Sequence, residues 1–168
     1  MSNTSRTRRR LSIAAVAAAL LVVVAGVAAA VPAGTVLVVE DIDTGERYIT
    51  HPVENGSVVA LEYMHSVEKS RVYDEYRVAG QTLVNTRMEF DSYGWGLPSG
   101  ANVTTVDGTL VYEPPAPIME LETLSVSPGR IANHTLIVDD TRYDLVTRTD
   151  ARDVRLHIER RTLTDVFL

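Results

Sequence analysis

The sequence predicts an all-β protein: one antiparallel sandwich or barrel of about ten short strands, preceded by an N-terminal transmembrane or signal helix. Three observations support this prediction. After residue 34, no stretch keeps an apolar period of 3.6 residues. Short runs with alternating apolar and polar residues recur instead. Gly, Pro, Asn and Asp separate these runs, as is typical of turns.

The expected strands follow one another along the whole body. SVVALEYMH, residues 57–65, alternates clearly and places Val59, Leu61 and Tyr63 on one face. The dipeptides Asp107-Gly108 and Asp139-Asp140 are typical of two-residue hairpin turns between neighbouring runs. The other expected strands are 35–40, 46–50, 71–79, 82–91, 103–106, 109–113, 119–125, 130–138, 142–148 and 154–161.

An apolar run of 21 residues, 11–31, precedes the body. It is long enough to cross a bilayer core, which takes about 20 residues. All four arginines that precede this run lie in the tail 1–10, so we expect a cytoplasmic tail, one membrane span and a body, 35–168, outside the cell. A signal peptide cut near the alanines at 28–30, which would release a secreted body, is the alternative.

The body is acidic and lacks cysteine. Residues 32–168 carry 12 basic and 22 acidic residues, a formal net charge of −10, so we expect no nucleic-acid partner. The absence of cysteine excludes disulfides, thiolate metal sites and a cysteine nucleophile. Lys69 is the only lysine beside 15 arginines, and this usage suggests a halophilic, haloarchaeal source.

The stretch 61–78 concentrates the side chains that are candidates for a site. The candidates for binding a ligand or partner are Tyr63, His65, Ser66, Glu68, Lys69, Glu75 and Tyr76. If runs 57–65 and 71–79 pair as a hairpin, we expect His65 and Glu75 to approach each other across it. A binding surface for an anionic group or a partner loop, and a purely structural hairpin, are the two open interpretations.

Two chemical alternatives fit this stretch poorly. A serine hydrolase would use Ser66 with His65, but neighbouring strand residues point to opposite faces and no G-x-S-x-G turn is present. A metal site at His65, Glu68 and Glu75 lacks a paired-histidine spacing. We therefore expect no enzyme activity, no metal and no cofactor.

A second candidate stretch is FDSYGWGLPSG, residues 90–100. It holds the only tryptophan, Trp95, between Gly94 and Gly96, which permit unusual backbone angles. Trp95 is expected either to anchor a partner or to plug one end of the β fold, which is the commoner fate of a lone tryptophan. The remaining histidines, expected to be structural, are His51, His134 and His157.

Three N-x-S/T sequons lie in the body, at Asn55, Asn102 and Asn133. Each stands in a turn-like or polar stretch. They predict surface glycosylation of an exported domain.

Two segments together, YMHSVEKSRVYDEY at 63–76 and FDSYGWGLP at 90–98, resemble the family called domain of unknown function 1850. The resemblance covers roughly residues 35–125, with Arg71 where the family often has proline and Trp95 where it has a small residue. It implies a small exported or membrane-anchored β protein whose gene accompanies a TAXI-type TRAP transporter. Such a transporter pairs a substrate-binding protein with a membrane permease.

The resemblance thus implies an accessory protein that contacts the TRAP permease or its substrate-binding protein, and it carries over no catalytic residues. The alternatives are a small-ligand or ion-binding β module centred on His65 and Glu75, or a structural cell-surface protein.

Overall fold

The computed structural model describes residues 32–93, 98, 102–115 and 119–162. These residues form strands and one short helix, which confirms the all-β prediction. The chain divides into two units, one of them residues 35–159, to which the fold described below belongs. The described parts of the other unit are the outer ends of the first and last strands.

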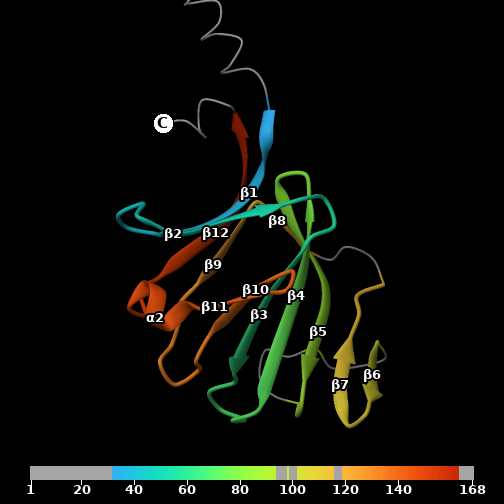
Figure 1. Cartoon of the computed structure of the whole chain (residues 1–168). Coiled ribbons are helices and arrows are strands. Elements are labelled where there is room, and N and C mark those ends of the chain that lie inside the picture. Colours follow the sequence, from blue (N-terminus) through green and yellow to red (C-terminus); the bar gives the residue numbers. More distant parts are fainter. Residues whose placement is uncertain (1–31, 94–97, 99–101, 116–118, 163–168) are drawn as a thin grey trace, which may run out of the picture. The chain divides into compact units, whose positions relative to one another are not determined.

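The smaller sheet has four strands in the order β2-β1-β12-β9 (Figure 1). Their bounds are β1 (Pro32–Asp41), β2 (Arg47–Val53), β9 (Thr123–Val126) and β12 (Val154–Thr162). On β12, Val154, Leu156 and Ile158 are buried and alternate with more exposed polar residues. Buried and more exposed side chains on β12 thus alternate with the period of two residues that the sequence predicted.

The larger sheet has eight strands, in the order β11-β10-β3-β4-β5-β7-β6, with β8 also paired to β5. Their bounds are β3 (Val58–Met64), β4 (Arg71–Ala79), β5 (Thr82–Phe90), β6 (Val103–Val106), β7 (Thr109–Tyr112), β8 (Glu120–Leu121), β10 (Thr135–Val138) and β11 (Thr141–Asp144). Neighbouring strands of this sheet pair antiparallel.

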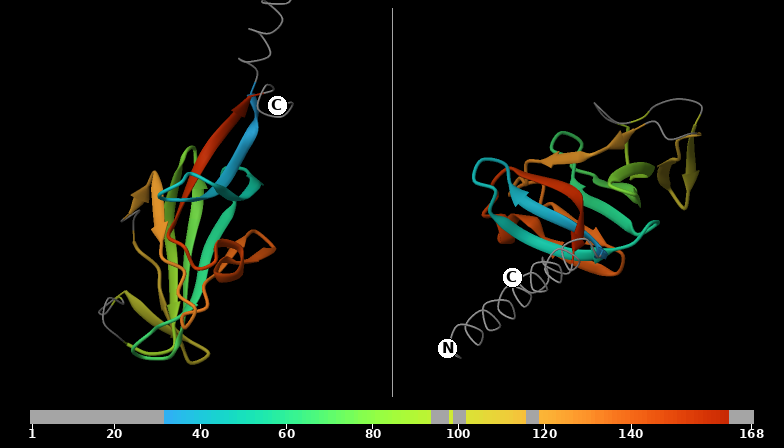
Figure 2. Two further views of the ribbon diagram at one scale, coloured as in Figure 1. Left: turned by 90° about the vertical axis from the view of Figure 1, so that its left-hand side faces the viewer. Right: turned by 90° about the horizontal axis from the view of Figure 1, so that it is seen from above.

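One hydrophobic core lies between the two sheets (Figure 2). Both sheets contribute a face of buried side chains to it, and each sheet is open within the described residues, so the fold is a sandwich and not a barrel. The fully buried side chains of the core cluster are Leu37, Val39, Val59, Leu83, Leu136, Val138, Leu145, Val154 and Leu156. Burial of this apolar surface is the main force that holds the sheets together.

Both dipeptide turns expected from the sequence are present. Asp107 and Gly108 join β6 to β7 with φ angles of 50° and 88°. Positive φ at both central residues is the signature of a type I′ turn, whose twist suits a two-residue hairpin. Asp139, with φ 49°, likewise begins the turn between β10 and β11.

Three expected strands were wrong in extent. The run 119–125 is two strands, β8 and β9, which belong to different sheets. The run 142–148 is not one strand, because β11 ends at Asp144 and helix α2 (Leu145–Thr149) follows. The Asp144 side chain accepts a hydrogen bond from the Thr147 N–H at 3.0 Å and so caps this helix. The run 130–138 begins as a loop, and β10 starts only at Thr135.

Among the described residues, no helix has the length and apolar character needed to cross a membrane. The expected cytoplasmic tail, 1–10, and the expected membrane or signal helix, 11–31, lie outside the described residues.

Candidate functional site

The β3–β4 hairpin that the sequence predicted is present, and its turn holds four of the candidate residues. The His65 N–H donates to the Ser70 carbonyl at 2.8 Å, and the Lys69 N–H donates to the His65 carbonyl at 2.9 Å. The Glu68 N–H donates to Nδ1 of His65 at 3.2 Å. Ser66, Glu68 and Lys69 are exposed, so this turn presents their side chains to solvent.

The expected approach of His65 and Glu75 was wrong. Glu75 pairs with Ala60 in the middle of the hairpin, whereas His65 follows the last pair, Met64 with Arg71. The Glu75 side chain lies on the outer face of the sheet and accepts a hydrogen bond from the Thr86 hydroxyl at 2.8 Å. The register of the hairpin therefore separates the two residues along the strands.

The inner face of the same hairpin holds a buried carboxylate that the sequence analysis did not single out. Asp74 is only 8% exposed, and its Oδ2 accepts a hydrogen bond from the Tyr63 hydroxyl at 3.1 Å. Its Oδ1 is buried without a hydrogen-bond partner among the described residues. The available signal was its alternation with the apolar residues Val72, Tyr76 and Val78, which placed Asp74 on the core face.

Burial shifts the pKa of this carboxylate and of the two tyrosines beside it, Tyr63 and Tyr76. Burial raises the pKa of Asp74 to about 6, and the hydrogen bond from Tyr63 opposes this rise only in part. Burial and the charge of Asp74 raise the pKa of Tyr76 to about 12, and they raise that of Tyr63 as well. Tyr63 and Tyr76 are thus neutral hydroxyls around a buried acid.

His134 joins this group from a distant part of the chain. Its ring stacks on the Tyr63 ring, with 4.9 Å between centroids and 17° between planes. Its Nδ1 accepts a hydrogen bond from the Gly129 N–H at 3.2 Å, and burial lowers its pKa. His134 therefore ties the loop that precedes β10 to the core.

The other two histidines expected to be structural also have partners. Nδ1 of His51 in β2 lies 2.6 Å from the hydroxyl of Tyr143 in β11, which links one strand of each sheet. Nε2 of His157 lies 2.9 Å from Glu159, and the His157 side chain is 18% exposed.

A bulge opens where β10 leaves β3. The two strands pair as far as Glu62 and Thr135. Beyond this pair, the Met64 N–H donates to the Ala132 carbonyl at 2.7 Å, so residues 133–134 stand opposite a single residue of β3. Such an arrangement, with two residues opposite one, interrupts the hydrogen bonds between the two strands locally and redirects side chains.

The bulge is bordered by a cavity of about 210 Å³, which we call the side pocket. Its lining residues are Glu62, Tyr63, Met64, Arg71, Ala132, Asn133 and Thr135. Asn133 is exposed and has a φ of 53°, a left-handed conformation that asparagine tolerates better than most residues. The pocket therefore combines a charged wall from β3 and β4 with a polar wall from the loop.

An alternating row of arginines and glutamates, the charge ladder, crosses the outer face beside the pocket. Nε of Arg71 donates to Glu62 at 3.0 Å and its Nη1 donates to Glu89 at 3.2 Å. Arg142 also donates to Glu62, and the guanidinium of Arg71 lies 5.3 Å from the centre of the Tyr73 ring. The ladder continues from Glu89 through Arg87 to Glu113.

The ladder sets the charge state of Glu62. Burial on its own would raise the pKa of Glu62, but the hydrogen bonds from Arg142 and Arg71 outweigh burial and lower it. Glu62 is therefore an anion that two guanidinium groups share.

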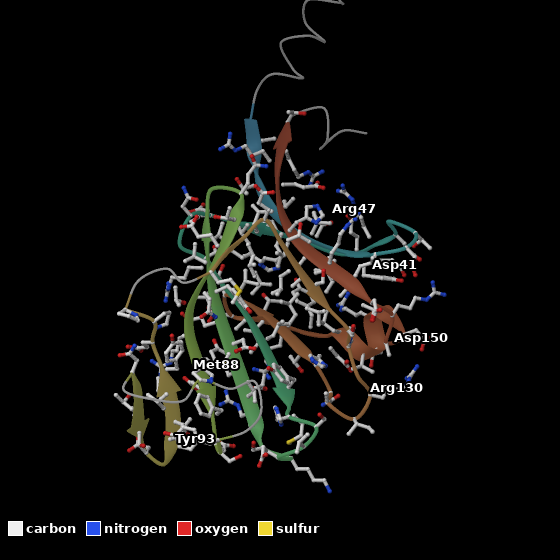
Figure 3. All side chains as sticks on the ribbon, turned by 180° about the vertical axis from the view of Figure 1, so that it is seen from behind. Asp41, Arg47, Met88, Tyr93, Arg130 and Asp150 are labelled. Carbon is white, nitrogen blue, oxygen red and sulfur yellow. The ribbon has the colours of Figure 1, made fainter. Side chains whose placement is uncertain are left out.

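The end of the larger sheet where the β3–β4 turn lies (Figure 1) carries several exposed apolar side chains. Five of the seven large apolar side chains that are exposed in the described residues belong to strand ends and loops at this end. They are Met64 (41% exposed), Val67 (67%), Tyr93 (55%), Val106 (51%) and Ile131 (89%), and we call them the apolar rim. Tyr93 is labelled in Figure 3, at the end of the chain segment that follows β5.

The remaining expectations concern Trp95, the sequons and metals. Trp95 lies outside the described residues. The sequon residues Asn55, Asn102 and Asn133 are exposed, and Oδ1 of Asn55 accepts a hydrogen bond from the Gly80 N–H at 2.7 Å. Within the described parts of the chain, no three His, Asp or Glu side chains are grouped so that they could hold a metal ion.

Comparison with known protein families matches residues 59–145 to the domain of unknown function DUF1850. The match spans just over half of the 168-residue chain. It runs from β3 to the first residue of α2 and includes every residue of the apolar rim and the side pocket. No curated protein and no solved structure matches the chain.

Proposed function

The chain belongs to the family of the domain of unknown function 1850, and from this membership we propose an extracytoplasmic docking protein that assists a TAXI-type TRAP solute transporter by protein contact. The proposed partner is the permease of the transporter or its substrate-binding protein. The proposed anchor is the apolar run 11–31, with the body outside the membrane. The role requires recognition of a protein surface and no chemistry.

The apolar rim is the observation that carries this proposal. The chain has a formal net charge of −6, which favours its solubility. At one end of the larger sheet, five large apolar side chains on loops and strand ends are nevertheless exposed to solvent. The five side chains share one end of the sheet, and an end of a sheet that carries several exposed apolar groups is a candidate interaction site. Loops held by a rigid sheet are also where recognition residues usually lie.

The small-ligand module centred on His65 and Glu75 is not favoured over this role. The hairpin register keeps the two residues apart, and Glu75 is engaged by Thr86 and by Arg77, the latter at 3.4 Å. A structural cell-surface role is the outcome that remains if no transporter component binds.

The test is affinity purification of the tagged full chain from native membranes in native salt, followed by mass spectrometry. The wild-type chain is expected to recover the TRAP permease or its substrate-binding protein. The double variant Val67→Asp, Ile131→Asp is expected to lose at least about tenfold of that recovery, because it places two charges in a contact that excludes water. Both residues are strongly exposed, so the variant is expected to fold.

Ile42 and Met119 provide the matched control. They are the two exposed large apolar residues of the described chain that lie away from the rim. The double variant Ile42→Asp, Met119→Asp is expected to recover the partner as the wild type does. Failure of the wild-type chain to recover either transporter component would overturn the proposal, and so would equal losses in the two double variants.

A further inference from the structure

We infer that the apolar rim faces away from the membrane and meets a soluble extracytoplasmic protein. Of the two partners proposed above, this is the substrate-binding protein and not the permease. The inference rests on the proposed docking function and on the proposed membrane span, residues 11–31. Which end of the body lies next to the membrane follows from the pairing of the strands.

The chain enters its folded body close to the membrane. The proposed span ends at residue 31 and β1 begins at Pro32, so no residues are left between them for a linker. Thr35 is the first residue of the unit 35–159, and the chain from residue 31 to Thr35 reaches at most about 14 Å when fully extended. Thr35 therefore lies within that distance of the bilayer surface.

The pairing of Thr35 places it at one end of the larger sheet. Thr35 pairs with Val53, the last residue of β2. The turn that leads from β2 to β3 is bonded to the last part of β4, since the Gly56 N–H donates to the Val78 carbonyl at 2.8 Å. β3 starts at this end and β4 finishes there. Thr35, the β2–β3 turn and the β4–β5 turn thus share one end of the sheet, which we call the anchor end.

The apolar rim lies at the opposite end of the larger sheet. β3 runs from the anchor end to Met64, and Val67 follows in the β3–β4 turn. The Met64 N–H is bonded to the residue after Ile131, which holds Ile131 at the same end. Tyr93 follows the end of β5 that pairs with the start of β4, and Val106 precedes the β6–β7 turn beside that end of β5. In Figure 1 the β3–β4 turn is at the bottom and the β4–β5 turn is at the top.

The length of β4 separates the two ends. Its nine residues span about 27 Å at about 3.4 Å per residue. When the strands stand upright on the membrane, the rim is farther from the bilayer than the anchor end by about this length. A membrane-embedded protein therefore reaches the anchor end first, whereas a soluble protein that approaches from the aqueous side reaches the rim.

The charges of the body favour this upright orientation. Residues 32–168 carry 12 basic and 22 acidic residues, a formal net charge of −10, and anionic lipid headgroups repel a body of this charge. Arg160 and Arg161, near the end of β12, belong to the same compact unit as the first residues of β1. Basic residues close to a membrane surface are attracted to anionic headgroups. An upright body keeps these two arginines next to the bilayer and the acidic remainder away from it.

Energy transfer to the membrane tests the orientation. The chain has no cysteine, so a single introduced cysteine can carry the only donor dye. Glu54→Cys puts the dye at an exposed position of the anchor end, and Val67→Cys puts it at the exposed rim. With the full chain in nanodiscs that contain an acceptor-labelled lipid, transfer from position 67 is expected to be at least about twofold weaker, because about the length of β4 separates the two positions. Equal transfer from both positions would place the rim on the bilayer and would overturn the inference.

Photo-crosslinking identifies the partner. The same two variants and Ile131→Cys carry a thiol-linked benzophenone in place of the dye. Each full-length variant shares a nanodisc with the purified permease, and the purified substrate-binding protein is added in solution. After illumination, adducts with the substrate-binding protein are expected from positions 67 and 131 and not from position 54, the matched control. Adducts between the rim positions and the permease, or equal adducts with the substrate-binding protein from all three positions, would overturn the inference.

The results for the inference and for the docking function can be told apart. If affinity purification recovers the permease and the rim positions crosslink to it, the docking function stands and the inference fails. If neither component is recovered or crosslinked while the dye at position 67 stays far from the bilayer, the docking function fails and only the orientation of the body stands.

Discussion

Asp74 brings a carboxyl group into the core, and its ionisation opposes folding. Its pKa is about 6 in the folded chain, against an ordinary value of 3.8. The folded chain therefore binds the proton more tightly than the unfolded chain does. The contribution of Asp74 to the free energy of unfolding is most favourable below about pH 4, falls as pH rises toward 6, and is constant above that range.

We predict that Asp74→Asn raises the free energy of unfolding at pH 7.5 by about 1 to 2 kcal/mol. The gain comes from removing a buried charge, at 1.36 kcal/mol for each pKa unit, less the cost of burying an amide N–H₂ without a full set of partners. The amide oxygen still accepts the hydrogen bond from Tyr63. Urea unfolding at pH 7.5 and pH 3.5 measures the effect, and no gain is expected at the lower pH.

Asp144 provides the control with the opposite sign. Hydrogen bonds from the side chain and the backbone N–H of Thr147 lower its pKa. Asp144→Asn is therefore expected to lose stability at pH 7.5, and the loss is expected to shrink as the pH falls below the ordinary pKa of 3.8. A destabilising effect of Asp74→Asn at pH 7.5 would contradict the prediction and would mean that its carboxylate has a stabilising partner.

The charge ladder connects neighbouring strands of the larger sheet on their outer face. Arg71 in β4 contacts Glu62 in β3 and Glu89 in β5, so one side chain links three strands. Single exposed ion pairs contribute little, but a guanidinium that is shared between two partly buried carboxylates contributes more.

We predict that Arg71→Gln lowers the free energy of unfolding by about 1 kcal/mol in 0.1 M salt. The loss is expected to shrink in 1 M salt, because the Debye length falls from about 10 Å to about 3 Å. Urea unfolding at the two salt concentrations measures both effects.

Arg130→Gln is the matched control. The pair of Arg130 with Asp150, both labelled in Figure 3, has side chains that are 66% and 82% exposed. Loss of this ion pair is expected to change the free energy of unfolding by less than about 0.5 kcal/mol. Equal effects of the two variants would show that the ladder acts only as separate surface pairs.

The folded chain as a whole carries an acidic surplus, with 22 acidic and 16 basic residues. Repulsion among like charges disfavours the compact state, and salt screens this repulsion. Salt also weakens the ladder, so the two effects oppose each other.

We predict that the net repulsion dominates and that the melting temperature rises by a few degrees between 0.1 M and 1 M KCl. Differential scanning calorimetry measures the change. Glu122→Lys, at an exposed position, is expected to reduce the slope because it lowers the surplus by two charges. A melting temperature that falls with salt would show that weakening the charge ladder destabilises the chain more than screening the acidic repulsion stabilises it.

The local parts of this fold could be read from the residues. The alternation of Val59, Leu61 and Tyr63 identified the inner face of β3, and Asp107-Gly108 identified the β6–β7 turn. Both signals come from neighbours in the chain, since side chains alternate across any strand and positive φ angles favour particular residues. The capping role of Asp144 was also local, but the β-rich run from 142 to 148 concealed it.

The candidate site was predictable only in part. Tyr63, His65 and Tyr76 lie on the hairpin that the sequence singled out. Tyr63 and its neighbour Glu62 also have partners, however, that come from far along the chain. The Tyr63–His134 stack and the bond from Arg142 to Glu62 arise because β10 pairs with β3 and β11 with β10. No sequence pattern within β3, β10 or β11 predicts which of these strands pair with each other.

Residues alone thus established most of the strands and turns, the acidic character of the chain and the hairpin at the centre of the site. The tertiary structure decided the rest: the sandwich and not the barrel, the separation of His65 from Glu75, the side pocket and the apolar rim. The physical reason is that alternation reports only which face a side chain occupies. Which strands become neighbours, and in what register, depends on how two whole faces bury their apolar surface together.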